Sequence, residues 1–305
     1  MNIMTLVNAL PGSVAQGLIW GILAIGVYIT YKILDFADLT VDGSLGTGGA
    51  VAVVLILHGV PVPLAIVCAF FAGCLAGLVT GLLNTLLGIP GILAGILTQL
   101  ALYSINLDIM GQANTAINVD KYPLFMSLRF IPMTILKGVI VVALLIAVLY
   151  WFFGTEYGFT IRATGCNSNM ARAQGINTKK STVIALILSN GLVGLAGGLL
   201  AQYQGNADIN MGRGAIVIGL AAVIIGEVIF GKLFKNFALR LLSAVIGGVI
   251  YYIVIALVLK LGLNANDLKL LSACVVAIFL GLPHWKAKVA AKHVKNDEKA
   301  GAQNA

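Results

Sequence analysis

The chain has 305 residues, of which 60% are hydrophobic and only 10% are charged, and its mean hydropathy is +1.01. Soluble domains carry about 25% charged residues, so this composition excludes a soluble globular protein. The formal net charge is +8, but the basic residues lie in short loops and in the tail and form no stripe with aromatic residues. We therefore predict no nucleic-acid partner and expect membrane lipid to surround most of the surface.

Apolar runs of about 20 residues, the length that crosses a hydrocarbon core of about 30 Å, recur along the chain. They predict an all-α, polytopic transmembrane helical bundle of about nine spans, near residues 11–34, 43–59, 62–86, 89–108, 131–153, 181–203, 213–231, 237–261 and 267–283. Eight spans are the alternative, because glycines crowd the start of the second run and could mark a broken or re-entrant helix. The membrane domain is expected to cover residues 1–283, followed by a basic cytoplasmic tail, residues 284–305.

Glycines spaced four residues apart recur within the runs. They are Gly73, Gly77 and Gly81, then Gly91 and Gly95, then Gly194 and Gly198. Because this spacing places small residues on one face of a helix, it predicts close packing between helix backbones.

The distribution of Lys and Arg predicts the orientation. Loop 154–182, turn 232–240 and the tail are basic and fall on one side of the membrane by alternation, whereas loops 204–212 and 262–266 contain no Lys or Arg. Cytoplasmic loops are enriched in basic residues, so loop 154–182 and the C-terminus are expected in the cytoplasm. The side on which the N-terminus lies depends on whether there are eight or nine spans.

Polar residues inside or beside the spans are candidates for a solute path. The acidic cluster Asp35, Asp38 and Asp42, with Thr40 and Ser44, could line such a path or contact a partner, or it could be an ordinary solvated turn. Amide side chains in lipid are costly, so those in the spans should face the bundle interior, as helix–helix hydrogen-bond partners or as ligand contacts. The predicted substrate-pathway residues are Asp38, Thr40, Asp42, Asn84, Gln99, Asn106 and Asn190.

No residue set for bond chemistry is present in the sequence. There is no H-E-x-x-H motif and no Cys/His ligand set, so no catalytic residue and no metal ligand are predicted. The phosphate loop G-x-x-x-x-G-K-[ST] is also absent, so any ATP energy must come from another polypeptide. Glu227 is the one acid well inside a run, and it is expected to be a boundary carboxylate in contact with water or a cation rather than an ion-coupling site.

The longest basic loop contains the strongest local feature. Residues 168–174 can form a short helix, with Asn167 or Ser168 as N-cap and Gly175 as the C-terminal stop. A short helix between long spans suits docking into a groove on a partner, although it could equally be an amphipathic connector. If it docks, the small side chain of Ala171 is expected on the docking face.

The same loop has the spacing G-x-x-x-R-A-x-G-x-N-x-x-x-A-x-x-x-G-I, made by Gly158, Arg162, Ala163, Gly165, Asn167, Ala171, Gly175 and Ile176. This pattern resembles the signature of permeases in branched-chain amino acid and ribose-type ABC importers. The resemblance extends to the small-residue segment 191–198 and to residues 35–43, which are similar to the family's Asn-Phe-Ala-His-Gly region. Asp38 stands where many relatives have His.

The resemblance implies a membrane-spanning permease subunit of an ATP-driven importer, not an enzyme, in the bacterial plasma (inner) membrane. It implies that the short helix is the coupling helix that contacts the ATPase, with coupling residues Arg162, Gly165, Asn167, Ala171, Arg172 and Gly175. The chain itself would bind no cofactor, while a cytosolic ABC ATPase dimer would use ATP and Mg. The other implied partners are an extracytoplasmic substrate-binding protein and a second permease copy, expected to form a homodimer.

The string Asp38-Leu-Thr-Val-Asp-Gly43 looks more like the subgroup associated with uptake of aromatic amino acids, tryptophan and tyrosine. The solute is therefore expected to be an amino acid, aromatic or branched-chain. One alternative is a proton- or sodium-coupled secondary transporter, which requires a functional Glu227. Another is a structural or channel protein of the membrane, which requires no nucleotide-dependent partner.

Overall fold

The computed structural model describes residues 3–231 and 233–260, together with residues 270, 273, 274, 276–278 and 281. The described part is an all-α bundle with one small sheet. Its helices are α1 (Ile3–Tyr28), which continues into the π-helical turn η1 (Ile29–Ile33), α2 (Thr40–Leu57), α3 (Val62–Thr85), α4 (Gly91–Met110), the 3₁₀ turn η2 (Leu128–Phe130), α5 (Ile131–Phe153), α6 (Glu156–Cys166), α7 (Ser168–Ala173), α8 (Thr178–Gln204), α9 (Ala215–Phe230) and α10 (Phe237–Lys260). The sheet pairs β1 (Asn114–Ala116) with β2 (Asn206–Asp208) in antiparallel register.

Within the described residues, seven helices are long and apolar enough to cross a membrane, and they correspond to the first six predicted spans and the eighth. The seventh predicted span, 213–231, contains α9, which is apolar but only 16 residues long. The ninth predicted span, 267–283, falls largely outside the described residues, and the tail 284–305 falls wholly outside them. The polytopic helical bundle is therefore confirmed, and the number of spans stays a prediction.

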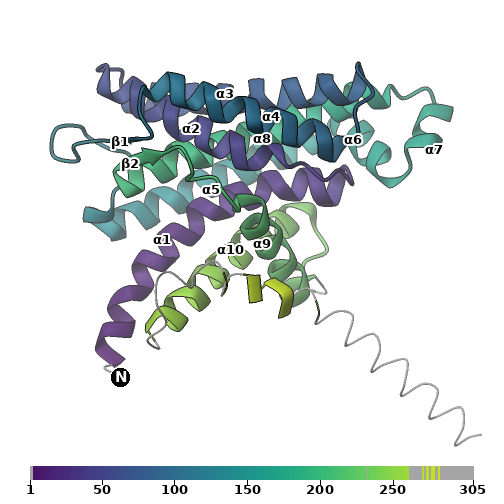
Figure 1. Ribbon diagram of the computed structural model, residues 1–305. Helices are drawn as coiled ribbons and strands as arrows, with labels where there is room; N and C mark the ends of the chain where they lie inside the picture. The colour runs from purple at the N-terminus through teal and green to yellow at the C-terminus, as the bar shows by residue number, and fades with distance from the viewer. Residues whose placement is uncertain are drawn as a thin grey trace, which may run out of the picture.

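The two ends of the bundle carry different structures (Figure 1). At the end on the left of the view, β1 and β2 pair with Thr115 opposite Ala207. At the other end, the short helices α6 and α7 connect α5 to α8. Between these ends α8 packs along both α2 and α3, while α1 packs along α9 and α10. We refer to the two ends below as the β end and the α7 end.

Helix α2 is one continuous α-helix, so the glycines at its start do not break it. They allow close packing instead, because a Cβ on Gly48 would overlap the carbonyl oxygen of Gly194 on α8. On α3, a Cβ on Gly73 would in the same way overlap the carbonyl oxygen of Asn190. Small residues at these positions let the backbones of α2, α8 and α3 touch, as the glycine spacing predicts.

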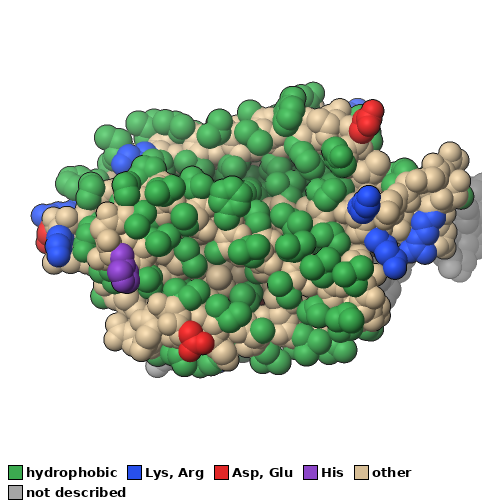
Figure 2. Space-filling model, turned by 90° about the horizontal axis from the view of Figure 1, so that it is seen from above, with side chains coloured by type: hydrophobic (Ala, Val, Ile, Leu, Met, Phe, Trp, Pro, Cys, Tyr) green, Lys and Arg blue, Asp and Glu red, His purple; other side chains and the backbone are tan. Residues whose placement is uncertain are grey.

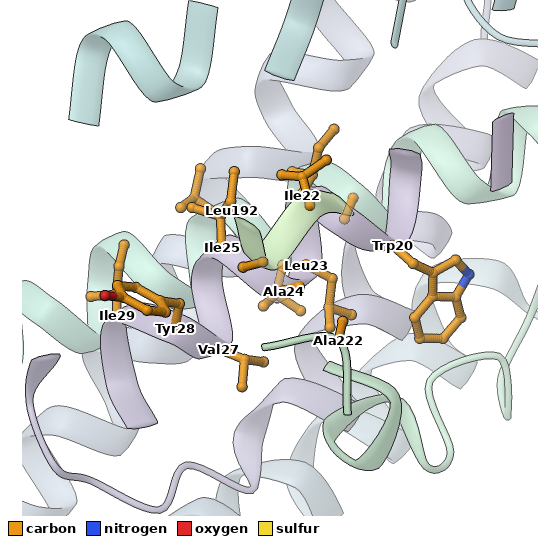
Figure 3. Packing of buried hydrophobic residues seen from close by; sticks show 14 of the residues in the cluster. Trp20, Ile22, Leu23, Ala24, Ile25, Val27, Tyr28, Ile29, Leu192 and Ala222 are labelled. Atoms are coloured by element: carbon orange, nitrogen blue, oxygen red, sulfur yellow. The ribbon is translucent and has the colours of Figure 1, made fainter. Parts of the chain in front are cut away.

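The helices divide into an inner and an outer group. Of the most apolar stretch of each span, 83% is buried in α1 but only 17% in α5. Figure 3 shows the buried side chains of α1, among them Leu23 and Ile25, gathered with Leu192 of α8 and Ala222 of α9. On the outer surface, Figure 2 shows exposed hydrophobic side chains across the middle and Lys and Arg side chains near the two ends. An apolar belt between charged ends is the surface that a bilayer requires.

Candidate functional site

A chain of hydrogen bonds between buried side chains joins the start of α2 to the middle of α8. Asp38 lies in the connection between the first two spans, and its carboxylate accepts from the backbone N–H of Thr40 at 2.9 Å and from Nδ2 of Asn190 at 2.7 Å. The Oδ1 of Asn190 accepts in turn from the hydroxyl of Ser44 at 2.7 Å. None of these residues is more than 2% exposed. The acidic cluster is therefore no ordinary solvated turn at Asp38, whereas Asp35 is exposed.

The environment of Asp38 changes its acidity. Burial raises the pKa of the Asp38 carboxyl above its ordinary value, while the hydrogen bonds from Thr40 and Asn190 lower it. A carboxylate in such a place is stable only where donors surround it, and the amide of Asn190 is the donor that comes from another span.

Threonine hydroxyls extend this network from α2 to α3 and α4. The hydroxyl of Thr40 lies 2.7 Å from that of Thr80, and the hydroxyl of Thr80 donates to Thr98 at 2.9 Å. Thr80 and Thr98 were not predicted from the sequence. A threonine in a helix can bond the carbonyl four residues earlier, so its presence in a span does not indicate a partner on another helix.

Asp42 holds the N-terminus of α9 against α2. Its carboxylate accepts from the backbone N–H groups of Gly214 and Ile216, both at 2.9 Å. A helix N-terminus carries about half a positive charge, and a carboxylate placed there stabilises it. The short helix α9 thus starts beside α2, two residues after the start of the predicted span 213–231.

A cavity of about 270 Å³ lies beside Asp42, between α2, α4 and the segment that precedes α9. Three predicted substrate-pathway residues, Asp42, Gln99 and Asn106, meet in its wall. Asn106 is only 2% exposed, and its Oδ1 has no hydrogen-bond partner among the described residues. The exposed Arg213 also lines the cavity. Arg213 was not predicted as a site residue, because it stands at the boundary between a loop and a predicted span, where a basic residue is ordinary.

Asn84 lies apart from the other predicted pathway residues. Its Nδ2 donates to the carbonyl of Ile89 at 2.8 Å, which closes the turn after α3. Together with Gly165 and Asn167, it lines an open cleft of about 680 Å³ at the α7 end. The structure therefore separates Asn84 from the cavity that contains Gln99 and Asn106.

Two of the predicted coupling residues hold α6 to the bundle. The guanidinium of Arg162 lies over the ring of Phe237 at 4.3 Å and over that of Phe153 at 5.5 Å. A Cβ on Gly165 would overlap the carbonyl oxygen of Ile33, so α6 packs closely against the end of η1. Both residues fix the base of the loop that carries α7.

Helix α7 occupies residues 168–173, where the sequence predicts a short helix. The side chain of Asn167 caps it by accepting from the N–H groups of Asn169 and Met170, and Gly175 with φ of +79° follows its C-terminus. Arg172 donates from Nε to the hydroxyl of Thr178 at 3.0 Å, which ties α7 to the start of α8.

One expectation about α7 is wrong. Ala171 is only 1% exposed and points into the protein, so it does not lie on an outward docking face. The large apolar side chain that α7 presents to its surroundings is Met170, which is 56% exposed. With only six residues in the helix, periodicity in the sequence could not decide which face turns outward.

Glu227 forms an ion pair with Lys32. The two charged atoms lie 2.7 Å apart, and the side chains are 46% and 44% exposed. The expected contact of Glu227 with a cation is confirmed, and its position at the membrane boundary stays a prediction. Within the described residues, no group of three or more His, Cys, Asp or Glu side chains is arranged to hold a metal ion.

Comparisons with known proteins find a matching family and several relatives. A family profile described as "Branched-chain amino acid transport system / permease component" matches residues 10–281. A tyrosine transport system permease protein of Clostridioides difficile (strain R20291) is 39% identical over 272 residues, which cover 87% of this chain and 88% of the relative. A galactofuranose transporter permease of Escherichia coli (strain K12) is 27% identical, covering 70% of this chain and 61% of the relative. A fructose import permease of Rhizobium meliloti is 26% identical, covering 77% and 66%. No solved structure matches the chain.

Proposed function

Because the chain belongs to the family of branched-chain amino acid transport system permease components, we propose that it is the membrane-spanning subunit of an ATP-driven importer for an aromatic amino acid such as tyrosine. Support for the solute comes from the tyrosine transport permease that shares 39% of its residues over most of both chains. The sugar permeases are more distant, at 26–27% identity. The proposed setting is the bacterial inner membrane, with the α7 end and the C-terminus in the cytoplasm.

The cavity beside Asp42 is the proposed point of contact with the solute. At about 270 Å³ it is slightly below the range of about 300–1,000 Å³ that holds drug-sized ligands, so it suits a molecule of amino-acid size. An amino acid carries a carboxylate, which the exposed Arg213 can bind, and an ammonium group, which can donate a hydrogen bond to the side-chain oxygen of the half-buried Gln99 in the cavity wall. Tyr103 and Leu100 supply apolar surface for its side chain.

The exposed face of α7 is the proposed contact with a cytosolic ABC ATPase dimer, which would bind ATP and Mg. Met170 stands out from this face, and Arg162 and Gly165 hold the base of the loop against the bundle. ATP-driven closure of the ATPases would push on α7, and the rigid base would pass this movement to the spans as a rigid-body tilt. A second permease copy and an extracytoplasmic binding protein complete the proposed assembly.

The observation that carries the proposal is the family match over residues 10–281. The test is purification of the tagged chain from its own cells, with mass spectrometry of the proteins that accompany it, followed by uptake of labelled L-tyrosine into vesicles that contain the complex. We expect an ATPase subunit to accompany the chain and uptake to require internal ATP. Uptake that continues without ATP and stops with a protonophore would refute the proposal.

Secondary transport is a second candidate because of one buried group. Asp38 is a buried carboxylate that accepts hydrogen bonds from Thr40 and Asn190 beside the spans, and carboxylates buried within a helical bundle often serve as ion-coupling sites. Glu227, on which this alternative rested in the sequence, is exposed and paired with Lys32. Asp38→Asn distinguishes the candidates when uptake and the thermal unfolding midpoint are measured together: ion coupling predicts loss of gradient-driven uptake with the midpoint kept, whereas a structural role predicts that the midpoint falls and that the uptake by the remaining folded protein still requires ATP.

A further inference from the structure

An apolar groove of about 420 Å³ runs along the outside of the bundle between α5 and α10. Its wall extends from Val139 to Ile146 on α5 and from Ala238 to Val249 on α10, and every side chain that lines it is apolar. With a rise of 1.5 Å per residue, the stretch on α10 is roughly 16 Å long, about half of a hydrocarbon core of about 30 Å. The groove therefore has the length of one membrane leaflet.

Towards the α7 end a second, basic cavity of about 650 Å³ lies next to this groove. The basic cavity is lined by Lys32, Arg162, Lys235 and Arg240. The two cavities are neighbours along α5, because Ile146 lines the groove while Tyr150 and Phe153, one and two turns further along the same face, line the basic cavity. An apolar groove one leaflet long thus has a cluster of cations next to its end at the α7 side.

The charges in this cluster are largely uncompensated. Lys32 is paired with Glu227, but Arg162, Lys235 and Arg240 form no ion pair within the described part of the chain. Arg162 lies over the aromatic rings of Phe237 and Phe153, which leaves its charge in place. The N-terminus of α10 starts at the same cavity and adds further positive potential.

We propose that this composite site binds an anionic phospholipid of the leaflet at the α7 end. The headgroup phosphate would lie among Arg162, Lys235 and Arg240, and one acyl chain would fill the groove between α5 and α10. The groove offers no polar group to a peptide or a solute, and the excess of cations favours a headgroup with net negative charge over a zwitterionic one. This inference does not depend on the solute or on the ATPase.

The first experiment tests the headgroup. Purified chain in detergent is titrated with phosphatidylglycerol or phosphatidylcholine, and binding is followed by native mass spectrometry and by the thermal unfolding midpoint. We expect phosphatidylglycerol to bind at least about tenfold more tightly than phosphatidylcholine, since a basic residue near an anionic surface contributes about a factor of five. The double variant Lys235→Gln with Arg240→Gln should lose this preference. The control Lys179→Gln with Lys180→Gln removes two exposed charges from the same end and should keep it.

The second experiment tests the groove. Ala143 lines it, so Ala143→Phe should fill it and reduce retention of both lipids severalfold. Ala147→Phe adds the same ring at an exposed position of α5 that does not line the groove and should leave retention unchanged. The proposal is overturned if the two lipids bind equally, if the Lys235 and Arg240 variant retains phosphatidylglycerol like the wild type, or if inorganic phosphate alone reproduces the thermal shift.

Discussion

The buried network around Asn190 and the exposed helix α7 are both organised by short polar side chains, but their partners differ in distance along the chain. In the network, Ser44 and Asn190 are 146 residues apart and belong to different spans. In α7, Asn167 bonds to N–H groups two and three residues further on. The network therefore depends on the assembled bundle, whereas α7 organises itself. Substitutions in the network should destabilise the fold, whereas substitutions of the exposed side chains of α7 should weaken partner binding and leave the fold stable.

The largest effect is expected where backbones touch beside the network. Gly48→Val places a branched side chain where the carbonyl of Gly194 lies, so α2 and α8 must separate. Overpacking of this kind costs about 3 kcal/mol or more when backbone has to move. We expect loss of monodisperse protein in size-exclusion chromatography. Ala147→Val, on the exposed face of α5, is the control and should purify normally. A normal yield of Gly48→Val would contradict the backbone contact.

A smaller loss is expected within the network itself. Asn190→Ala leaves the carboxylate of Asp38 and the hydroxyl of Ser44 without their partner. An unsatisfied buried polar group costs about 1–3 kcal/mol. The thermal unfolding midpoint in detergent should fall clearly, while Asn169→Ala, which removes an exposed amide, should leave it unchanged. Equal midpoints for the two variants would mean that the network does not stabilise the bundle.

The difference between the two regions is tested most directly on α7. Met170→Ser should weaken association with the ATPase by about 1–2 kcal/mol, the range of a moderate interface hot spot, without changing the thermal stability of the chain. Met133→Ser removes an equally exposed methionine from α5 and should leave association intact. The measurement is the amount of ATPase recovered with the tagged chain at increasing salt.

Ala171 provides a contrasting substitution on the same helix. Because Ala171 is buried, Ala171→Trp should overfill a contact inside the chain and cost about 1–3 kcal/mol of stability. Thermal stability and ATPase recovery should then fall together, unlike in Met170→Ser. If Ala171→Trp lost only the ATPase, the outward face of α7 would be assigned wrongly.

The smallest effect is expected at Glu227. Glu227→Gln breaks an ion pair in which both side chains are nearly half exposed, and such pairs contribute between about 0 and 1 kcal/mol. ATP-dependent uptake and thermal stability should both stay near the wild-type values. A collapse of uptake in Glu227→Gln with ATP held constant would revive the secondary-transport alternative in its original form.

Local patterns made most of the fold predictable. The apolar runs predicted both ends of seven spans to within three residues. This was possible because the length and position of a span depend on the apolar residues of that segment alone. The caps of α7 were predictable for the same reason, since Asn167 and Gly175 act on their immediate neighbours. The glycine spacing correctly indicated close packing, although not which helix each glycine meets.

The candidate site was predictable only in part, because its contacts join distant segments. Polar residues in the spans pointed to Asp42, Gln99 and Asn106, which do share a cavity. Nothing in the sequence placed Asn84 at the α7 end, joined Thr80 to Thr98, or brought Arg213 to the cavity. Asp42 could be recognised from the sequence as a polar residue beside a span. Its hydrogen bonds to the N-terminus of α9 could not be predicted, because their donors, Gly214 and Ile216, are 172 and 174 residues away in the chain.

The self-contained caps of α7 have a consequence for how an assembly could form and separate. A segment that folds only on binding loses conformational entropy at that moment, and the loss lowers its affinity. The caps Asn167 and Gly175, with the hydrogen bond from Arg172 to Thr178, hold α7 in its helical conformation in the isolated chain. The conformational entropy of this segment is therefore lost on folding, before any partner binds. A preorganised helix of this kind can leave its partner and return to it through repeated cycles without refolding each time.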